Sequence, residues 1–572
     1  MIWKPRSPLF SIAISAILFL VAGCKPQQES QKPDFSKLTE DFVYDSLALS
    51  PTSATQAGYH EHQGVKLDEK LDDFSPAGIQ AAQTFYSNFK TRLLAIDPQT
   101  LSPEDRADYQ IIQNAIDLSL QDLQEVQGYR HNPTIYVELI GNALFSPYVL
   151  EYAPLDARFG QIIHRLTQTP ALIDQAKANL VDAPEVWNKS AREENDGNID
   201  LIDKTLRAKT PANLKTDFDK AAGPALAALR SFNEFLKNDL SKKTSDWRLG
   251  KQQYARKFAD TLTAGKTPEE VLAEAESALQ QTRDQMAKLA APRSIRETLD
   301  AIAKQHTTPE LFMEQAGKDL NLATAFVRAK QLVTFPSRNN LQVIPTPEFM
   351  RGTYGVAGFN PAPAFEPQLG AFYWVTPIPA DWPKQRVESK LREYNRYGMM
   401  EITIHEAMPG HYVQFEVADN LEPKSRRALR NIYGNVPYVE GWALYTQQMM
   451  SEEGFMDHSK ELQFAFYKQL LRSIANAILD IRLQTMGMTD QQALDLMMND
   501  TFQEKEEATG KLQRAQLTSC QLPTYFVGLR GWLDTREAYK QRKGTAFSIS
   551  NFHDAALKES AVPLPTLQQL LQ

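Results

Sequence analysis

The chain has 572 residues, of which 42% are hydrophobic and 23% are charged, and its formal net charge is −8. This length and composition are sufficient for a large buried core. Because Lys and Arg are scattered along an acidic chain rather than clustered, the composition argues against nucleic acid as a partner.

The N-terminus has the features of an export signal. Lys4 and Arg6 precede an apolar run over residues 9–21, which is too short for a permanent membrane span. The run ends in LVAGC, and small residues before a cysteine indicate a lipoprotein. We therefore expect a signal peptide over residues 1–23, cleavage before Cys24 and lipid on its sulfur. An ordinary signal peptide with a chance cysteine is the alternative.

A lipidated Cys24 would anchor the mature protein to a membrane, because two or more acyl chains give stable attachment. The residue after the cysteine is Lys25 rather than an aspartate, which in Gram-negative sorting favours the outer membrane, facing the periplasm. Residues 24–35 are polar and contain proline, and predict a flexible tether. With Cys24 lipidated, Cys520 has no cysteine left to pair with, so the core must stabilise the fold.

Residues 36–330 have mostly helical periodicity. In the segment 267–290, Thr267 fits an N-cap, Pro268 fits the first helical position, and apolar residues then recur on one face. These patterns predict structural helices, to which we assign no chemistry.

The composition changes between residues 335 and 383, where Gly, Pro and aromatic residues exclude a long helix. LQVIP (341–345) and GAFYWVTP (370–377) have strand composition and predict a small sheet or paired ribbon. Helical sequence resumes near Arg386. We therefore expect a mainly α fold with a small β-sheet, and a catalytic region over residues 331–572 that is closely joined to the helical region before it.

The sequence HEAMPGH at residues 405–411 differs from the zinc-peptidase pattern His-Glu-x-x-His, because its second histidine comes two residues late. On a straight helix His405 and His411 would lie about 240° and roughly 9 Å apart, too far to share one ion. Pro409 lacks the N–H that would bond to the His405 carbonyl and should bend or end the helix around Met408. Gly410 can then let the chain return His411 toward His405.

A catalytic zinc usually has three protein ligands and one open position. Glu440 lies at the start of an apparent amphipathic helix and supplies a third ligand. We therefore predict that His405, His411 and Glu440 bind one Zn2+ ion. Glu406 would act as general base toward the water that the zinc activates. In the alternative interpretation both histidines are satisfied core residues.

Three segments, HEAMPGHYVQ, EGWALYTQQMMSEEG and QLPTYFVG, together resemble a bacterial family labelled domain of unknown function 885. This family is grouped with the zinc-dependent metallopeptidases and contains many lipoproteins. The resemblance extends over nearly the whole mature chain. The HExxPGH and EGWALY pair is specific, whereas the matches near the N-terminus are weaker.

The resemblance implies a gluzincin-type, largely helical zincin-like fold, similar in plan to thimet oligopeptidase or angiotensin-converting enzyme. Helices would surround a deep substrate channel, and a small sheet would flank the active-site helix. His405, His411 and Glu440 would be the ligands and Glu406 the base. Tyr525 matches the late Tyr-x-x-Gly position and would stabilise the oxyanion.

Further residues are expected to contact the substrate. Tyr373 could line the substrate cleft, and Arg472, Arg514 or Arg530 could hold a substrate carboxylate, although each also fits a structural role. The chain departs from many relatives at Gln484, where they have histidine, and at residues 519–521, where they have Pro-Gly-Gln. Asp480 could orient a ligand histidine or form a surface salt bridge.

The favoured hypothesis is a lipid-anchored zinc metallopeptidase that hydrolyses short peptides in the cell envelope. Two alternatives remain from the sequence. The first is a non-catalytic envelope lipoprotein that binds peptides or a partner on the same fold, which the intact Glu406 disfavours. The second is a zinc hydrolase of non-peptide amides or esters, for which the zinc chemistry would be the same.

Overall fold

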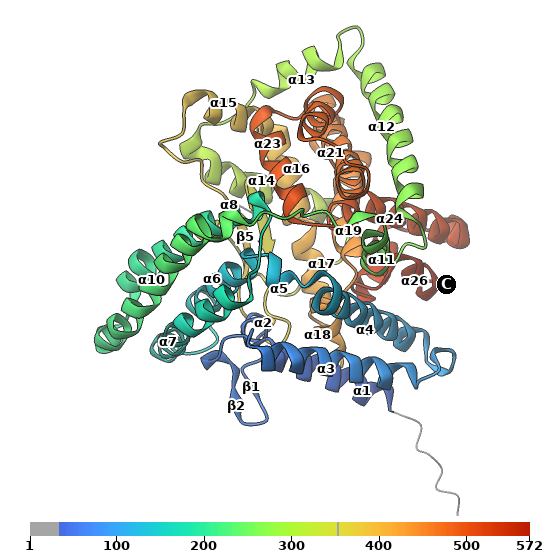
Figure 1. Cartoon of the computed structure of the whole chain (residues 1–572). Helices are drawn as coiled ribbons and strands as arrows, with labels where there is room; N and C mark the ends of the chain where they lie inside the picture. The colour runs from blue at the N-terminus through green and yellow to red at the C-terminus, as the bar shows by residue number, and fades with distance from the viewer. Residues whose placement is uncertain (1–33, 352–353) are drawn as a thin grey trace, which may run out of the picture. The chain divides into compact units, whose positions relative to one another are not determined.

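Helices account for most of the residues that the computed structural model describes, which are 34–351 and 354–572 (Figure 1). The mainly α fold predicted from the sequence is therefore confirmed. The predicted signal peptide, Cys24 and the tether up to residue 33 lie outside the described residues. Within the described ranges, no helix combines the length and the apolar character needed to cross a bilayer.

Phe35–Gln572 forms one structural unit, and no boundary divides it near residue 330. Its N-terminal part consists of helices and a short antiparallel hairpin of β1 (Glu61–His62) and β2 (Val65–Lys66). The helices are α1 (Phe35–Leu49), α2 (Pro51–Ala57), α3 (Pro76–Leu94), α4 (Pro103–Gln121), α5 (Gly128–His131), α6 (Thr134–Val149), α7 (Leu155–Asn179), α8 (Glu185–Asp200), α9 (Arg207–Lys209), α10 (Lys215–Asn238), α11 (Gly250–Leu262), α12 (Pro268–Ala290), α13 (Ile295–Ala303) and α14 (Phe312–Lys330).

Local sequence signals explain where such helices begin. The Thr267 hydroxyl accepts a hydrogen bond from the Glu270 amide at 3.2 Å, and the Glu270 carboxylate accepts one from the Thr267 amide at 2.8 Å. This reciprocal cap satisfies two amides that the first turn of α12 leaves without helical partners. The predicted start of this helix is therefore confirmed.

The C-terminal part is also helical and contains the HEAMPGH sequence. Its helices are α15 (Lys384–Glu393), α16 (Arg396–Glu406), α17 (His411–Ala418), α18 (Lys424–Ile432), α19 (Val436–Glu452), α20 (Phe455–His458), α21 (Lys460–Thr485), α22 (Asp490–Asp495), α23 (Lys505–Leu517), α24 (Pro523–Lys543), α25 (Ile549–Lys558) and α26 (Leu564–Leu570).

A three-stranded sheet joins these two parts. Its central strand β5 (Ala371–Val375) pairs in parallel with β3 (Leu341–Pro345) and antiparallel with β4 (Ala357–Asn360). β3 and β5 coincide with the strands predicted from sequence. β4 was not predicted, because it is short and glycine at its second position weakens the strand pattern.

Both faces of β5 are buried, and successive side chains point to opposite sides of the sheet. Tyr373 and Val375 belong to an apolar core shared with α14 and α16. Phe372 and Trp374 pack on the other side against Leu150, which directly follows α6. The sheet therefore connects the N-terminal helices to the helix that carries the histidine motif.

The motif helix α16 is enclosed by protein. Every residue from Tyr397 to His405 is buried, and α14, α19 and α21 pack around the helix. A helix that is apolar on nearly all sides is suited to such a position. Its last turn is therefore held in a fixed place relative to the surrounding helices.

Helices α19 and α24 cross at unusually close range through two glycines. A Cβ atom on Gly528 would lie 2.1 Å from the Pro437 carbonyl oxygen and 2.7 Å from the Gly441 Cα. Gly441 directly follows Glu440, and Gly528 lies one helical turn after Tyr525. The crossing therefore fixes the relative positions of Glu440 and Tyr525.

Replacing this crossing glycine tests the packing. We expect Gly528→Ala to lower the free energy of unfolding by about 1–3 kcal/mol, because the added methyl group must push two backbones apart. As a control, Gly223→Ala on α10 adds a methyl group with no heavy atom within 4 Å. It should stabilise the protein by about 0.5–1 kcal/mol. Urea unfolding of the three proteins measures both effects, and equal stabilities of Gly528→Ala and the wild type would contradict the close crossing.

Candidate metal centre

The proline and glycine in HEAMPGH separate two helices. α16 ends at Glu406 and α17 begins at His411, so the helix ends two residues earlier than the predicted break at Met408. The Met408 amide donates to the Thr403 carbonyl at 3.2 Å, and the Gly410 amide donates to the Ile404 carbonyl at 3.0 Å. The Met408–Pro409 peptide bond is cis. The prediction that this segment interrupts the helix is confirmed.

Gly410 is required by close packing in this turn. A Cβ atom at this position would lie 1.9 Å from the His405 carbonyl oxygen and 2.4 Å from that of Ile404. The buried Trp442 indole donates to the carbonyl oxygens of Pro409, at 3.0 Å, and Gly410, at 3.1 Å. These hydrogen bonds hold the turn against α19, the helix that also carries Glu440.

The turn brings the three predicted ligands together. The Glu440 Oε2 atom lies 3.4 Å from His405 Nε2 and 3.6 Å from His411 Nε2, and one ligand atom from each residue lies within 4.8 Å of the others. Ligand atoms about 2.1 Å from a tetrahedral zinc ion would lie roughly 3.4 Å apart. His405, His411 and Glu440 could therefore hold a metal ion with little rearrangement, and the ion itself stays a prediction.

The electrostatics of this group are those of a carboxylate held between two imidazoles. Burial alone would raise the pKa of Glu440, but the imidazoles of His405 and His411, 3.4 and 3.6 Å away, hold it well below its usual range. Burial likewise opposes protonation of His411, yet Glu440 raises its pKa above the ordinary value. Glu440 Oε2 and His411 Nδ1 are buried without a hydrogen bond among the described residues. A buried carboxylate oxygen that makes no hydrogen bond is suited to binding a cation.

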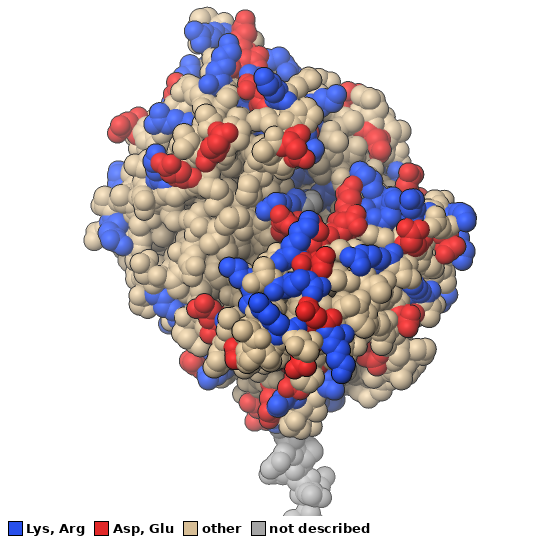
Figure 2. Space-filling view, turned by 90° about the vertical axis from the view of Figure 1, so that its left-hand side faces the viewer, with Lys and Arg blue, Asp and Glu red and all other residues tan. Residues whose placement is uncertain are grey.

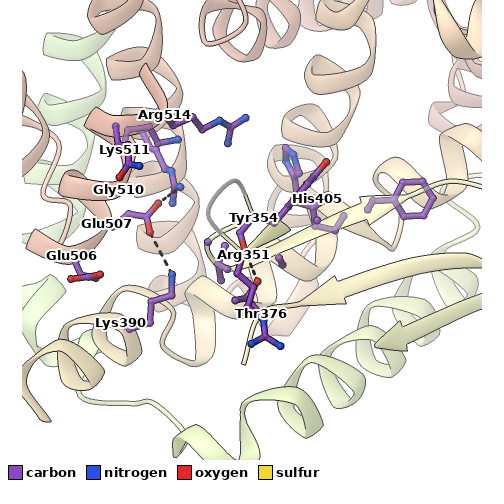
Figure 3. Close-up of a pocket in the computed structure, with 18 of the residues that line it drawn as sticks. Arg351, Tyr354, Thr376, Lys390, His405, Glu506, Glu507, Gly510, Lys511 and Arg514 are labelled. Atoms are coloured by element: carbon purple, nitrogen blue, oxygen red, sulfur yellow. Dashed lines mark hydrogen bonds and ion pairs between the residues drawn. The ribbon is translucent and has the colours of Figure 1, made fainter. Parts of the chain in front are cut away.

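These residues line a cavity of about 780 Å³ that extends from α16 and α19 to α23. His405 lies on one side of it, and Glu507, Lys511 and Arg514 project from α23 on the other (Figure 3). The face shown in Figure 2 is hollowed near its centre, and both basic and acidic side chains surround the hollow. The cavity is large enough for a short peptide or a compound of similar size.

Glu406 lies at the end of α16 and lines this cavity beside the metal-ligand group. Its carboxylate makes no hydrogen bond or ion pair with a described side chain, and the residue is only partly buried. It is therefore available to exchange a proton with a molecule in the cavity.

Tyr525 lies against His405, with the two rings stacked at a centroid distance of 6.3 Å. Its hydroxyl oxygen accepts hydrogen bonds from Arg514 at 3.3 Å and from the Gln521 amide at 3.4 Å. Burial and the charge of Glu440 raise the pKa of Tyr525 to about 12. The hydroxyl is therefore protonated at neutral pH, and its hydrogen is free to be donated into the cavity.

The sequence profile described as "Bacterial protein of unknown function (DUF885)" matches residues 51–571. The chain belongs to this family. The resemblance inferred from the three sequence segments is thus confirmed at the level of the family, whose description names no activity.

Two solved structures are similar to this DUF885 protein over nearly the whole chain. A candidate lipoprotein of unknown function from Shewanella oneidensis is 28% identical, with a TM-score of 0.76, and the match covers 94% of this chain and 99% of that one. A candidate lipoprotein from Colwellia psychrerythraea is 17% identical, with a TM-score of 0.77 and coverage of 94% and 98%. The second similarity shows the fold alone. No curated protein matches the sequence.

Tyr373 does not line the cavity as expected. Its side chain is fully buried in the core between β5 and α16, where its hydroxyl lies 3.1 Å from the Thr403 hydroxyl. The alternation along β5 directs it to the interior face of the sheet. Of the three arginines proposed for a substrate carboxylate, Arg472 and Arg514 line the cavity, whereas Arg530 is exposed and lines a separate depression.

Asp480 has neither of the roles considered from the sequence. It is fully buried, and its Oδ2 atom accepts hydrogen bonds from the Tyr254 hydroxyl at 2.6 Å and from the Cys520 amide at 2.8 Å. Gln484, one turn later, donates to the Thr518 carbonyl at 3.3 Å. Both residues therefore fix the loop that leads into α24 and to Tyr525.

Several residues of the cavity were missed by sequence reasoning. Phe359 on β4 stacks on His411 with ring centroids 6.3 Å apart, and Lys390 and Lys511 contribute basic groups. These residues are distant in sequence from the histidine motif, so the sequence did not indicate that they lie near it in the fold. The one available signal was the strand-like, aromatic composition before the motif.

The buried Asp480 predicts a pH dependence of stability. Burial raises the pKa of Asp480 to about 6, although the hydrogen bonds from Tyr254 and Cys520 act in the opposite direction. The ordinary aspartate pKa is about 3.9, so the unfolded chain releases this proton first. The contribution of Asp480 to stability is therefore full below about pH 4 and falls by up to about 3 kcal/mol as the pH rises through 6.

Asp480→Asn removes this titration while keeping an oxygen that can accept both hydrogen bonds. We expect the difference in unfolding free energy between wild type and Asp480→Asn to change with pH between about 4 and 6, in the direction that favours the variant at higher pH. Urea unfolding at several pH values measures it. A difference that is constant over this range would contradict the assignment.

Proposed function

We propose that this protein is a zinc-dependent hydrolase of short peptides in the cell envelope. The observation that carries the proposal is the convergence of His405, His411 and Glu440 despite a six-residue spacing that a continuous helix could not accommodate. The turn that produces this convergence needs Gly410 and is fastened by Trp442. Several features of the molecule thus serve the placement of these three side chains.

Two imidazole nitrogens and one carboxylate are a ligand set suited to zinc, and the cavity leaves a further position accessible. Zinc bound there would supply Lewis acidity, which polarises a carbonyl group and lowers the pKa of a water molecule. The buried Glu440 oxygen without a hydrogen-bond partner supports a cation in this place.

Glu406 would move the proton. In amide hydrolysis, water adds to the carbonyl carbon, the C–N bond breaks, and one proton passes from the water to the departing nitrogen. Glu406 lies beside the ligand group with its carboxylate unengaged, so it can take this proton and then deliver it to the amine.

Tyr525 would stabilise the negative charge that develops on the carbonyl oxygen. Because its oxygen accepts hydrogen bonds from Arg514 and Gln521, its own O–H can be donated to the cavity. A donor held in advance at such a position stabilises the transition state more than the ground state.

The strand β4 supports a peptide as the substrate. It is an edge strand of the sheet, and its residues Gly358 and Phe359 line the cavity. An extended peptide can add to such an edge through main-chain hydrogen bonds, which an ester or a small amide would use less fully. A polar cavity with an edge strand beside the ligand group thus favours peptides over other carbonyl substrates.

The relatives and the N-terminal sequence support a location in the cell envelope. The S. oneidensis and C. psychrerythraea relatives are described as candidate lipoproteins, which supports association with the cell envelope. The LVAGC sequence supports lipid attachment at Cys24, and Lys25 after the cysteine favours the outer membrane, facing the periplasm. Short peptides that enter the periplasm would then be the accessible substrates.

The role of Glu406 is tested by Glu406→Gln, which keeps the size of the side chain and removes its basicity. We expect zinc content to stay at the wild-type level and the turnover of a mixture of short peptides to fall by about 100-fold or more. Mass spectrometry of the products and of the metal measures both. Wild-type turnover in the variant would contradict the mechanism.

The metal site is tested separately by His411→Ala. We expect about one zinc per chain in the wild type and almost none in this variant, because two remaining ligands bind zinc weakly. His164→Ala, which changes an exposed histidine on α7, is the matched control and should keep its zinc. Equal zinc in all three proteins would remove His411 from the ligand set.

A further inference from the structure

The wall of the cavity opposite His405 carries more basic than acidic groups. Arg472 on α21 forms an ion pair with Glu507, and the Lys390 amine lies 3.8 Å from the other oxygen of the same carboxylate. Glu507 therefore already compensates two cations. Lys511 and Arg514, one turn apart on the same face of α23, remain without a carboxylate partner among the described residues.

Arg514 has only neutral hydrogen-bond partners. Its Nη2 atom donates to the Gln521 side-chain oxygen at 3.2 Å and to the Tyr525 hydroxyl at 3.3 Å. In Figure 3 its guanidinium group extends from α23 toward the side of the cavity where His405 lies. Most of the donors of this guanidinium are left for another acceptor.

Lys511 is the more unusual of the two. The residue is only 5% exposed and lines the cavity, yet it makes no hydrogen bond or ion pair with any described residue. Burial, with the nearby charges of Arg472 and Arg514, lowers its pKa well below the usual lysine value. A buried lysine amine without a partner costs free energy, and an apolar side chain would serve the fold better. An anion in the cavity would account for a lysine here.

We propose that Lys511 and Arg514 form a carboxylate-binding subsite, which receives the C-terminal carboxylate of a short peptide. The proposal rests on the proposed function and specifies the end of the substrate on which it acts. A carboxylate between a lysine and an arginine forms the strong, charge-assisted hydrogen bonds that both residues lack in this structure.

The position of the subsite sets where the peptide would be cut. Arg514 donates a hydrogen bond to the Tyr525 hydroxyl, and the Tyr525 ring stacks on His405. An extended residue spans about 3.5 Å, so only one or two residues fit between the subsite and the ligand group. The protein would therefore release one or two residues from the C-terminus of its substrate.

Binding of matched probes tests the subsite independently of hydrolysis. The probes are N-acetyl-tetraalanine, its C-terminal amide, and the same amide with glutamate as the last residue. Calorimetry with the full protein carrying Glu406→Gln, with zinc supplied, measures their dissociation constants. We expect the free acid to bind about 30-fold or more tightly than either amide, because a desolvated charge pair is lost in the amides.

Lys511→Met identifies the residue responsible. In the Glu406→Gln protein it should reduce the acid-to-amide ratio to nearly one, while the unfolding temperature rises because a buried amine without a partner is replaced by an apolar side chain. Arg386→Met is the matched control, since Arg386 is another cation of this cavity but is paired with Glu506 at 2.6 Å. This variant should keep the wild-type ratio.

The outcomes separate the two proposals. Equal binding of acid and amide, or a ratio unchanged by Lys511→Met, overturns the subsite even if peptides are hydrolysed. Tight binding of the glutamate amide overturns the assignment to the C-terminal carboxylate and assigns the subsite to acidic side chains. Preference for the free acid in a protein whose wild type hydrolyses no peptide would support the subsite and overturn the proposed peptidase activity.

Discussion

The site depends on a break of four residues in the helical backbone between α16 and α17. The turn is so tight that a Cβ atom on residue 410 would overlap the His405 carbonyl oxygen. Glycine removes that clash, and proline prevents the helix from continuing through the turn. The two histidines therefore face one point because the chain cannot form the longer helix that would separate them. The Trp442 indole then satisfies the two carbonyl groups that the break exposes in the protein interior.

A second constraint concerns how polar groups are buried around this turn. Glu440 lies in a helix that is otherwise almost wholly buried, so its charge must be compensated from nearby. Two imidazoles supply part of that compensation, and a metal ion would supply more. The close glycine crossing of α19 and α24 also positions a side chain of this site, because it places Tyr525 beside the His405 ring. Backbone packing by small residues thus sets the distance between Glu440 and Tyr525.

The sequence predicted the parts of this arrangement that are local. The helix break, two strands of the sheet and the cap of α12 follow from residues within a few positions of each other, whose effects on the backbone are short-ranged. β4 and the β1–β2 hairpin were too short to leave a pattern. Tyr373 lies in the core and not at the cavity, and the sequence left both positions open because strand alternation shows two faces without showing which one meets the cavity. The role of Asp480 depends on Tyr254 and Cys520, which are distant in sequence and meet it only in the folded chain.

Acidic and basic side chains are distributed unevenly in the cavity, and this distribution would affect how a substrate is oriented. Glu406 and Glu440 lie beside the histidines, whereas the cations that Glu507 does not compensate lie on α23. A peptide carries a carboxylate at one end only, so such a cavity would orient it before any bond is broken. Keeping Lys511 buried without a partner costs stability in the absence of a ligand. Binding of a carboxylate at the proposed subsite would offset that cost, so part of the binding free energy would come from relieving an unfavourable arrangement in the folded protein. A cavity built in this way would be less stable than an apolar one, and it would be more selective for the end of the peptide that it binds.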